Sequence, residues 1–200
     1  TPSSVLETMI YPDYRTVIAF GSSGVNTPFD PMLVRWSDRG KPGSWGITDT
    51  NSAGGQILTT GSFIIGAARS KKEVLIWTDE CVYVMSYIGG DFIFSMKEIA
   101  DGVSIMGQNA FATAGNSVFW MGDRNFYIYT GSVEVLPCSV LNYVFSDLNY
   151  NQRAKIVGAR NTEFGEVTFF YPSSDSSEND RYVSYSYVER AWSIGNMART

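Results

Sequence analysis

The sequence predicts an all-β protein made of about four similar units, each an antiparallel sheet of four strands. The first observation is a repeat: an apolar, strand-like run reaches a large aromatic residue near a polar turn at Trp36, Trp77, Trp120 and Phe170, which are 41, 43 and 50 residues apart. The second is that short turns rich in Gly, Asp or charge separate the runs, as antiparallel hairpins require. Repeats of this length built only from strands indicate blades of a β-propeller.

The repeat divides the chain into one propeller segment over residues 1–200, with units at about 15–60, 61–109, 110–157 and 158–200. The strands expected in the first unit are 16–21, 32–37 and 44–47. A Gly-, Ser- and Thr-rich stretch at 48–60 is predicted to be a connecting loop.

The second unit has the clearest pattern, with strands expected at 62–68, 73–78, 81–88 and 92–99. Along 81–88 both alternating sets of residues are mostly apolar, so both faces of this strand are expected to be buried. The later strands are expected at 110–114, 117–121, 125–130 and 133–136 in the third unit, and at 155–159, 166–171, 182–188 and 191–194 in the fourth.

Two insertions interrupt the later units. The apolar residues of Val140–Asn149 fall at helical spacing, which predicts one short helix with Ser139 as its cap. The stretch 172–180, PSSDSSEND, is acidic and rich in Ser, and we expect an exposed, mobile loop that buries nothing. After the last unit no spare strand remains to pair with 16–21 and close a ring, so we expect part of a longer propeller, or partners that cover the open edges.

Composition limits the possible partners. The formal net charge is −5, which argues against a groove that grips nucleic acid, because such a groove needs clustered Lys and Arg. No run approaches the roughly 18 to 20 apolar residues of a membrane-spanning helix, so no membrane contact is expected. Cys81 and Cys138 lie in different units within apolar runs and are expected to be free, buried thiols.

The sequence offers little for catalysis. There is no histidine, the two cysteines are not a CxxC pair, and neither a G-x-G-x-x-G nor a P-loop motif occurs. The conspicuous carboxylates occupy turns, where caps are the expected role: Asp79, Glu80, Asp91, Asp101 and Asp123. We therefore expect no enzyme, no catalytic, cofactor-binding or metal-binding residues, and no cofactor.

Two other readings of the motifs remain open. Residues 37–45, SDRGKPGSW, are similar to the Asp-box hairpin of sialidases, with the Gly-to-Trp spacing two residues longer. A propeller glycosidase would also need clustered arginines, for which Arg35, Arg69 and Arg124 are candidates. The repeated Trp residues could stack on sugars, although burial between blades explains one repeated position better. A carbohydrate-binding propeller used in host recognition, with sugar stacked on Trp45 or Trp192, is the alternative function.

Two stretches resemble a family of virion proteins. The run 116–131, NSVFWMGDRNFYIYTG, is followed by 135–138, VLPC, and 143–149, YVFSDLN. Together with Val34–Asp38 and Gly43–Trp45 this pattern is similar to the tail nozzle and packaged-DNA stabilisation proteins of short-tailed bacteriophages. The similarity extends over about Thr16 to Thr200.

The resemblance implies a longer chain folded as a β-propeller, with six copies in a ring around the tail channel. It implies a structural role in lining or closing the DNA exit channel, assembly in the host cytoplasm, and a place in the virion tail. The expected partners are further copies, the portal, the adaptor and other tail proteins, with packaged DNA passing without specific binding during ejection.

Overall fold

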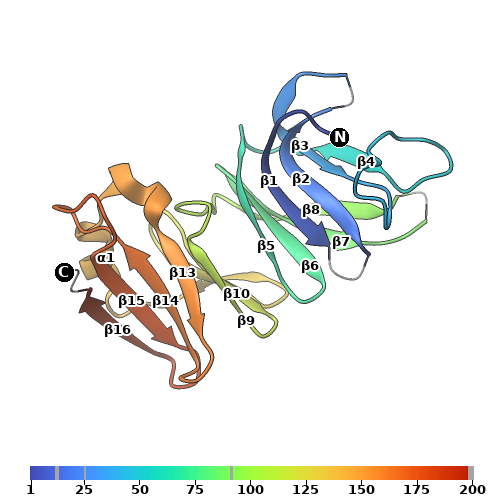
Figure 1. Ribbon diagram of the computed structural model, residues 1–200. Coiled ribbons are helices and arrows are strands. Elements are labelled where there is room, and N and C mark those ends of the chain that lie inside the picture. Colours follow the sequence, from blue (N-terminus) through green and yellow to red (C-terminus); the bar gives the residue numbers. More distant parts are fainter. Residues whose placement is uncertain (12–13, 25, 91, 198–200) are drawn as a thin grey trace. The chain divides into compact units, whose positions relative to one another are not determined.

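The computed structural model describes residues 1–11, 14–24, 26–90 and 92–197 (Figure 1). The protein is all-β, with 51% strand and 6% helix. Its chain divides into two compact units, Thr1–Val103 and Ser104–Thr200. Within the described ranges, each unit holds two four-stranded antiparallel sheets in which sequential strands are neighbours. Each sheet therefore has the up-and-down order of a propeller blade, as the repeat predicts.

The first unit is built from strands β1 to β8. One sheet contains β1 (Val5–Tyr11), β2 (Thr16–Ser23), β3 (Phe29–Trp36) and β4 (Gly54–Ile57). The other contains β5 (Ile64–Arg69), β6 (Glu73–Thr78), β7 (Cys81–Tyr87) and β8 (Phe94–Asp101). The second sheet agrees closely with the expected strands, and Cys81–Met85 is buried on both faces as predicted.

The second unit is built from strands β9 to β16. One sheet contains β9 (Phe111–Ala114), β10 (Ser117–Met121), β11 (Phe126–Tyr129) and β12 (Val133–Leu136). The other contains β13 (Val157–Asn161), β14 (Glu166–Tyr171), β15 (Arg181–Ser186) and β16 (Ala191–Asn196). All eight strands lie within a few residues of the expected positions.

The prediction for the first sheet was wrong in three places. The sheet begins at Val5, before the expected unit, because β1 pairs with β2 along its length. Residues 44–47 form no strand and belong to the long β3–β4 connection. The outer strand is β4, which lies inside the stretch predicted to be a loop and pairs with β3 from Leu33↔Ile57 to Trp36↔Gly54.

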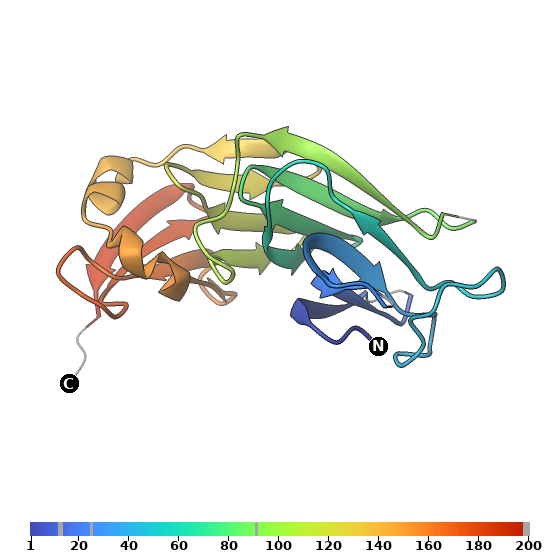
Figure 2. The same cartoon turned by 90° about the horizontal axis from the view of Figure 1, so that it is seen from above.

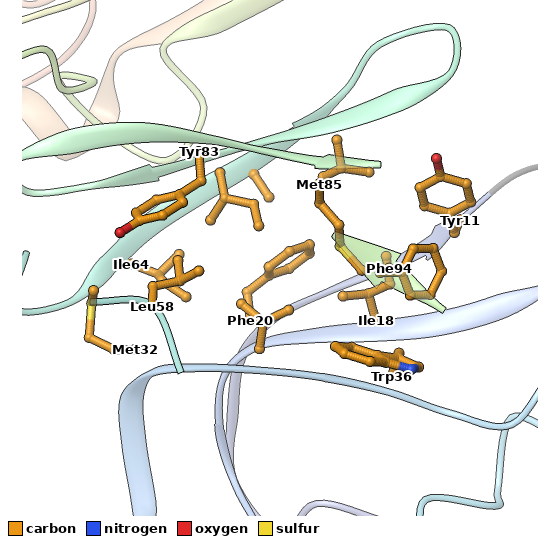
Figure 3. Close-up of a cluster of buried hydrophobic side chains, with 14 of the residues drawn as sticks. Tyr11, Ile18, Phe20, Met32, Trp36, Leu58, Ile64, Tyr83, Met85 and Phe94 are labelled. Atoms are coloured by element: carbon orange, nitrogen blue, oxygen red, sulfur yellow. The ribbon is translucent and has the colours of Figure 1, made fainter. Parts of the chain in front are cut away.

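The core of the first unit lies between its two sheets (Figure 3). Ile18, Phe20 and Trp36 of the first sheet are buried with Ile76 and Met85 of the second. A polar contact accompanies this packing: the Glu7 carboxylate accepts a hydrogen bond of 3.0 Å from the backbone N–H of Ala67 in β5. The open edge of β5 is thus partly satisfied by a side chain of the neighbouring sheet.

The core of the second unit also lies between its two sheets. Phe126 of β11 contacts Phe169 of β14 and Trp192 of β16, with ring centroids 5.4 Å and 4.6 Å apart. At the other side of the sheets, β13 approaches β9 so closely that a Cβ at Gly158 would lie 2.3 Å from the carbonyl oxygen of Phe111. Only glycine fits at this position.

The repeated aromatic residues occupy equivalent positions in three sheets only. Trp77, Trp120 and Phe170 are each the penultimate residue of the second strand of their sheet, whereas Trp36 ends the third strand of the first sheet. The prediction of four equivalent positions was wrong because β1 was not recognised, which shifted the strand count. Trp36, Trp77 and Trp120 are buried, and Phe170 is half-buried because alternate residues of β14 face outward.

The predicted helix is shorter and is followed by a second turn of helix (Figure 2). Helix α1 covers Leu141–Ser146, and a 3-10 segment, η1, covers Tyr150–Lys155. Val140, which has no capping side chain, occupies the N-cap position that was expected for Ser139.

The acidic loop 172–180 is held against this helical segment. Asn149 donates from its side chain to the carbonyl of Ser176 (2.9 Å), and Lys155 contacts the Glu178 carboxylate at 2.8 Å. Pro172 and Ser173 are buried. The expectation that this loop buries nothing was therefore wrong, because backbone and Ser, Asn and Asp side chains satisfy one another there.

Candidate functional site

The first sheet has one face in the core and one open face. The strand register places Leu6, Ile10, Val17, Leu33 and Ile57 on the open face. Leu6 is 53% exposed, Ile10 62% and Ile57 54%. Large apolar side chains gathered on one exposed sheet surface are typical of a binding interface.

Part of this open face is already covered by the β3–β4 connection. Arg35 points to the same face as Leu33 and is only 3% exposed. Its guanidinium donates to the backbone carbonyl of Trp45 and, at 3.5 Å, to that of Ser23, and it lies 5.8 Å from the centre of the Trp45 ring. Burial lowers the pKa of Arg35. This arginine therefore fastens the connection to the sheet.

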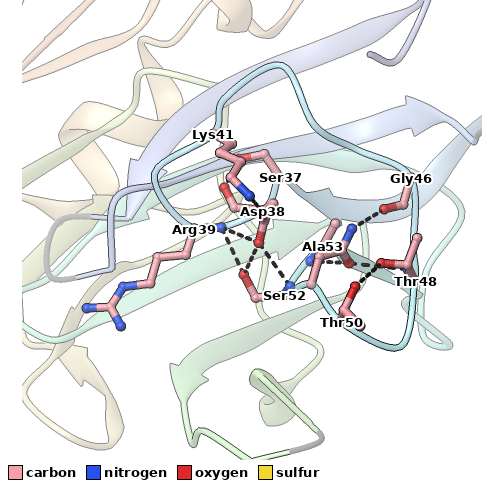
Figure 4. Close-up of polar contacts among 10 residues, drawn as sticks. Ser37, Asp38, Arg39, Lys41, Gly46, Thr48, Thr50, Ser52 and Ala53 are labelled. Atoms are coloured by element: carbon pink, nitrogen blue, oxygen red, sulfur yellow. Dashed lines mark hydrogen bonds and ion pairs between the residues drawn. The ribbon is translucent and has the colours of Figure 1, made fainter.

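Asp38 organises the same connection (Figure 4). Its Oδ1 accepts hydrogen bonds from the backbone N–H and the hydroxyl of Ser52 (3.0 and 2.9 Å) and from the backbone N–H of Arg39 (2.9 Å). The Lys41 ammonium lies 3.1 Å from its Oδ2. The Ser52 backbone and hydroxyl donors, with Lys41, lower the pKa of Asp38 to about 2. The segment similar to an Asp-box is thus a structural turn.

The other sequence candidates for chemistry are dispersed or structural. Asp79 accepts from the backbone N–H groups of Ser62 and Phe63, and Asp101 accepts from Gly102. Glu80 and Asp123 are exposed at turns, and Asp91 lies outside the described residues. Of the three arginines considered, Arg35 is buried, and Arg69 and Arg124 are exposed in different units. In the described part of the chain, no group of three His, Cys, Asp or Glu side chains could hold a metal ion.

The two tryptophans considered for sugar stacking both make contacts within the protein. Trp45 is 4% exposed and its Nε1 donates to the carbonyl of Pro42 at 2.7 Å. Trp192 donates to the carbonyl of Pro137 at 2.7 Å and packs against Phe126. Trp45 is therefore too buried to stack on a sugar, whereas Trp192 is only partly buried, so the carbohydrate alternative loses one of the two residues on which it was based.

Both cysteines are free. Cys81 is fully buried, as expected. The expectation for Cys138 was wrong, because its side chain is only partly buried. Burial raises the pKa of both thiols, which does not suit a nucleophile.

Sequence reasoning did not find the open face, because it left residues 5–11 unassigned. The signal was present: Leu6 and Ile10 alternate with Glu7 and Met9 in a strand-like run that precedes the Pro12-Asp13 pair, a common turn sequence.

No protein-family model matches this chain, and no curated protein sequence matches it. Among the described residues, no helix has the length and apolar character needed to cross a membrane.

Proposed function

We propose that this protein is a structural subunit of a bacteriophage tail, assembled as a ring that lines or closes the channel through which DNA leaves the virion. The proposal combines the resemblance to tail nozzle proteins with the repeated four-stranded sheets. The observation that carries it is the open apolar face of the first sheet, with Leu6, Ile10 and Ile57 more than half exposed. A neighbouring copy covers this face in the ring, which we expect to be hexameric.

The other properties of the chain agree with a channel component. Arg35 and Asp38, whose surroundings are unusual, both fasten a connection, which agrees with a structural role. The net charge of −5 suits a wall along which DNA passes without specific binding. The exposed carboxylate of Asp175 in the acidic loop adds repulsion toward DNA.

Sedimentation equilibrium and electron microscopy of the full chain test the assembly. We expect rings whose mass is a multiple of the monomer mass. The double substitution Ile10→Glu and Ile57→Glu should dissociate these rings, because both changes place charge in the buried interface. Phe164→Glu is the matched control, since Phe164 is 64% exposed outside this face. A protein that stays monomeric at high concentration, or rings that survive the double substitution, would contradict the proposal.

A further inference from the structure

A groove of about 450 Å³ lies at the loop end of the first unit. It is lined by Tyr11, Tyr14, Arg39, Lys72, Glu73, Ser86 and Tyr87. Tyr11 ends β1, Tyr14 precedes β2, and Arg39 belongs to the β3–β4 connection. Lys72 and Glu73 lie at the start of β6, and Ser86 and Tyr87 at the end of β7. Loops that meet on a rigid sheet scaffold are the usual location of binding sites, and this volume suits a small ligand.

Three side chains form a stack in this groove. The Arg39 guanidinium lies 4.6 Å from the centre of the Tyr14 ring, and the Tyr14 and Tyr87 rings have centroids 4.3 Å apart. Tyr14 is 8% exposed, whereas Tyr87 is 45% exposed. Tyr14 is therefore the buried middle of the stack, and Tyr87 is the ring that a ligand can reach.

The stack is held in place by its surroundings. The Tyr11 hydroxyl donates to the backbone carbonyl of Lys72 and accepts from the backbone N–H of Tyr87 at 3.3 Å. The Phe94 ring lies roughly perpendicular to those of Tyr14 and Tyr87, at centroid distances of 5.9 Å and 6.0 Å. The protein's own groups therefore hold the aromatic platform in position, and such preorganisation favours binding.

The polar lining adds two kinds of group. Arg39 and Lys72 are exposed cations that can bind an anionic group. Glu73 accepts a hydrogen bond of 3.0 Å from the Ser86 hydroxyl, and this pair can bind hydroxyl groups of a ligand. A fitting ligand therefore has a flat apolar face, a negative charge and several hydroxyls.

We infer that this groove binds an acidic saccharide, with a sugar ring on Tyr87, its carboxylate at Lys72, and its hydroxyls at Glu73 and Ser86. A nucleic acid strand fits less well, because a chain of net charge −5 lacks the clustered cations that bind a run of phosphates. The inference goes beyond the channel role and does not depend on ring formation.

A glycan array probed with the full chain tests the inference. It carries sialylated and uronate-containing oligosaccharides beside their neutral parents, with single-stranded oligothymidylate printed on the same slide. We expect retention of carboxylated glycans above their neutral parents and no retention of the oligonucleotide. Three results would each overturn the inference: retention of the oligonucleotide alone, equal retention of the neutral parents, or no retention of any carboxylated glycan.

Variants locate the binding. The glycan that the array retains most strongly is titrated into each variant by calorimetry. Tyr87→Ala should weaken its binding by about tenfold, since this change removes the stacking ring. Lys72→Gln, which replaces an exposed side chain and spares the stack, should weaken binding about fivefold and reduce its salt dependence. Tyr150→Ala is the matched control, because Tyr150 is 46% exposed in the other unit. Unchanged affinity in both groove variants would place the site elsewhere.

Discussion

Trp36 at the end of β3 lies against Gly54, its cross-strand partner in β4. A Cβ at position 54 would lie 2.5 Å from Cζ2 of the Trp36 ring. The same indole donates from Nε1 to the backbone carbonyl of Ser52 at 3.0 Å. One tryptophan thus holds the outer strand and the end of the connection that leads to it, and glycine is required because the ring occupies the space of a side chain.

Gly54→Ala should therefore destabilise the first unit. The added methyl group must displace the buried Trp36 ring, an overpacking that costs about 1–3 kcal/mol. The free energy of unfolding, measured by urea denaturation and tryptophan fluorescence, checks this. Gly46→Ala is the control, because nothing lies within 4 Å of a Cβ at position 46 and the expected change is below about 0.5 kcal/mol. Equal stability of the two variants would contradict the packing argument.

Asp38 should contribute stability that acid removes. Its pKa is lowered from 3.8 to about 2 in the folded protein, so the fold favours the carboxylate. The contribution is complete above the ordinary pKa and is lost as the pH falls through 3.8 toward 2. Urea midpoints measured between pH 2 and pH 6 should show a smaller acid loss for Asp38→Ala than for the native chain. Asp49→Ala, an exposed change in the same connection, should keep the native slope.

Asp180 should be the residue that closes the acidic loop. Its carboxylate accepts from the backbone N–H of Ser173 at 2.7 Å and from the Ser173 hydroxyl at 2.8 Å. Asp180→Ala should cost about 1.5–3 kcal/mol and expose residues 172–180 to proteolysis, because hydrogen bonds to a charged group are lost. Limited proteolysis with mass spectrometry provides the readout. Asp175→Ala, on an exposed side chain of the same loop, should leave the cleavage rate unchanged.

The two thiols should differ in access to reagents. Cys81 is fully buried and Cys138 is partly exposed. In the native protein a thiol reagent should label Cys138 slowly and Cys81 only through unfolding, so urea should accelerate Cys81 labelling far more. Peptide mass spectrometry after timed alkylation distinguishes the two sites. Labelling of Cys81 at the faster rate would contradict the packing of β7.

Local pattern was sufficient to identify most strands. Strand β6 was predicted with its observed bounds, Glu73–Thr78, because a short apolar run between two charged turns is typical of a buried strand. The same reasoning found β10, β12 and β14. In each case the hydrogen-bonding partners are strands adjacent in the chain, so the information lies within a short stretch of sequence.

Local pattern failed where the decisive contact was distant in sequence. The loop 172–180 has the composition of a disordered stretch, yet Asn149 and Lys155 hold it from a segment about 25 residues earlier. No short window of sequence contains both partners.

The sequence by itself determined that the protein is all-β, that it repeats a four-stranded unit, and where most turns lie, because hairpins depend on neighbouring residues. Only the tertiary structure decided that Gly54–Ile57 is a strand. Glycine disfavours strands, and this strand forms because Gly54 leaves room for the Trp36 ring of β3. The tertiary structure also decided that Leu6, Ile10 and Ile57 share one open face, and that Tyr14, Tyr87, Arg39 and Lys72 line one groove. Strand pairing within the first sheet brings the first group together, and packing between the two sheets of the first unit brings the second group together.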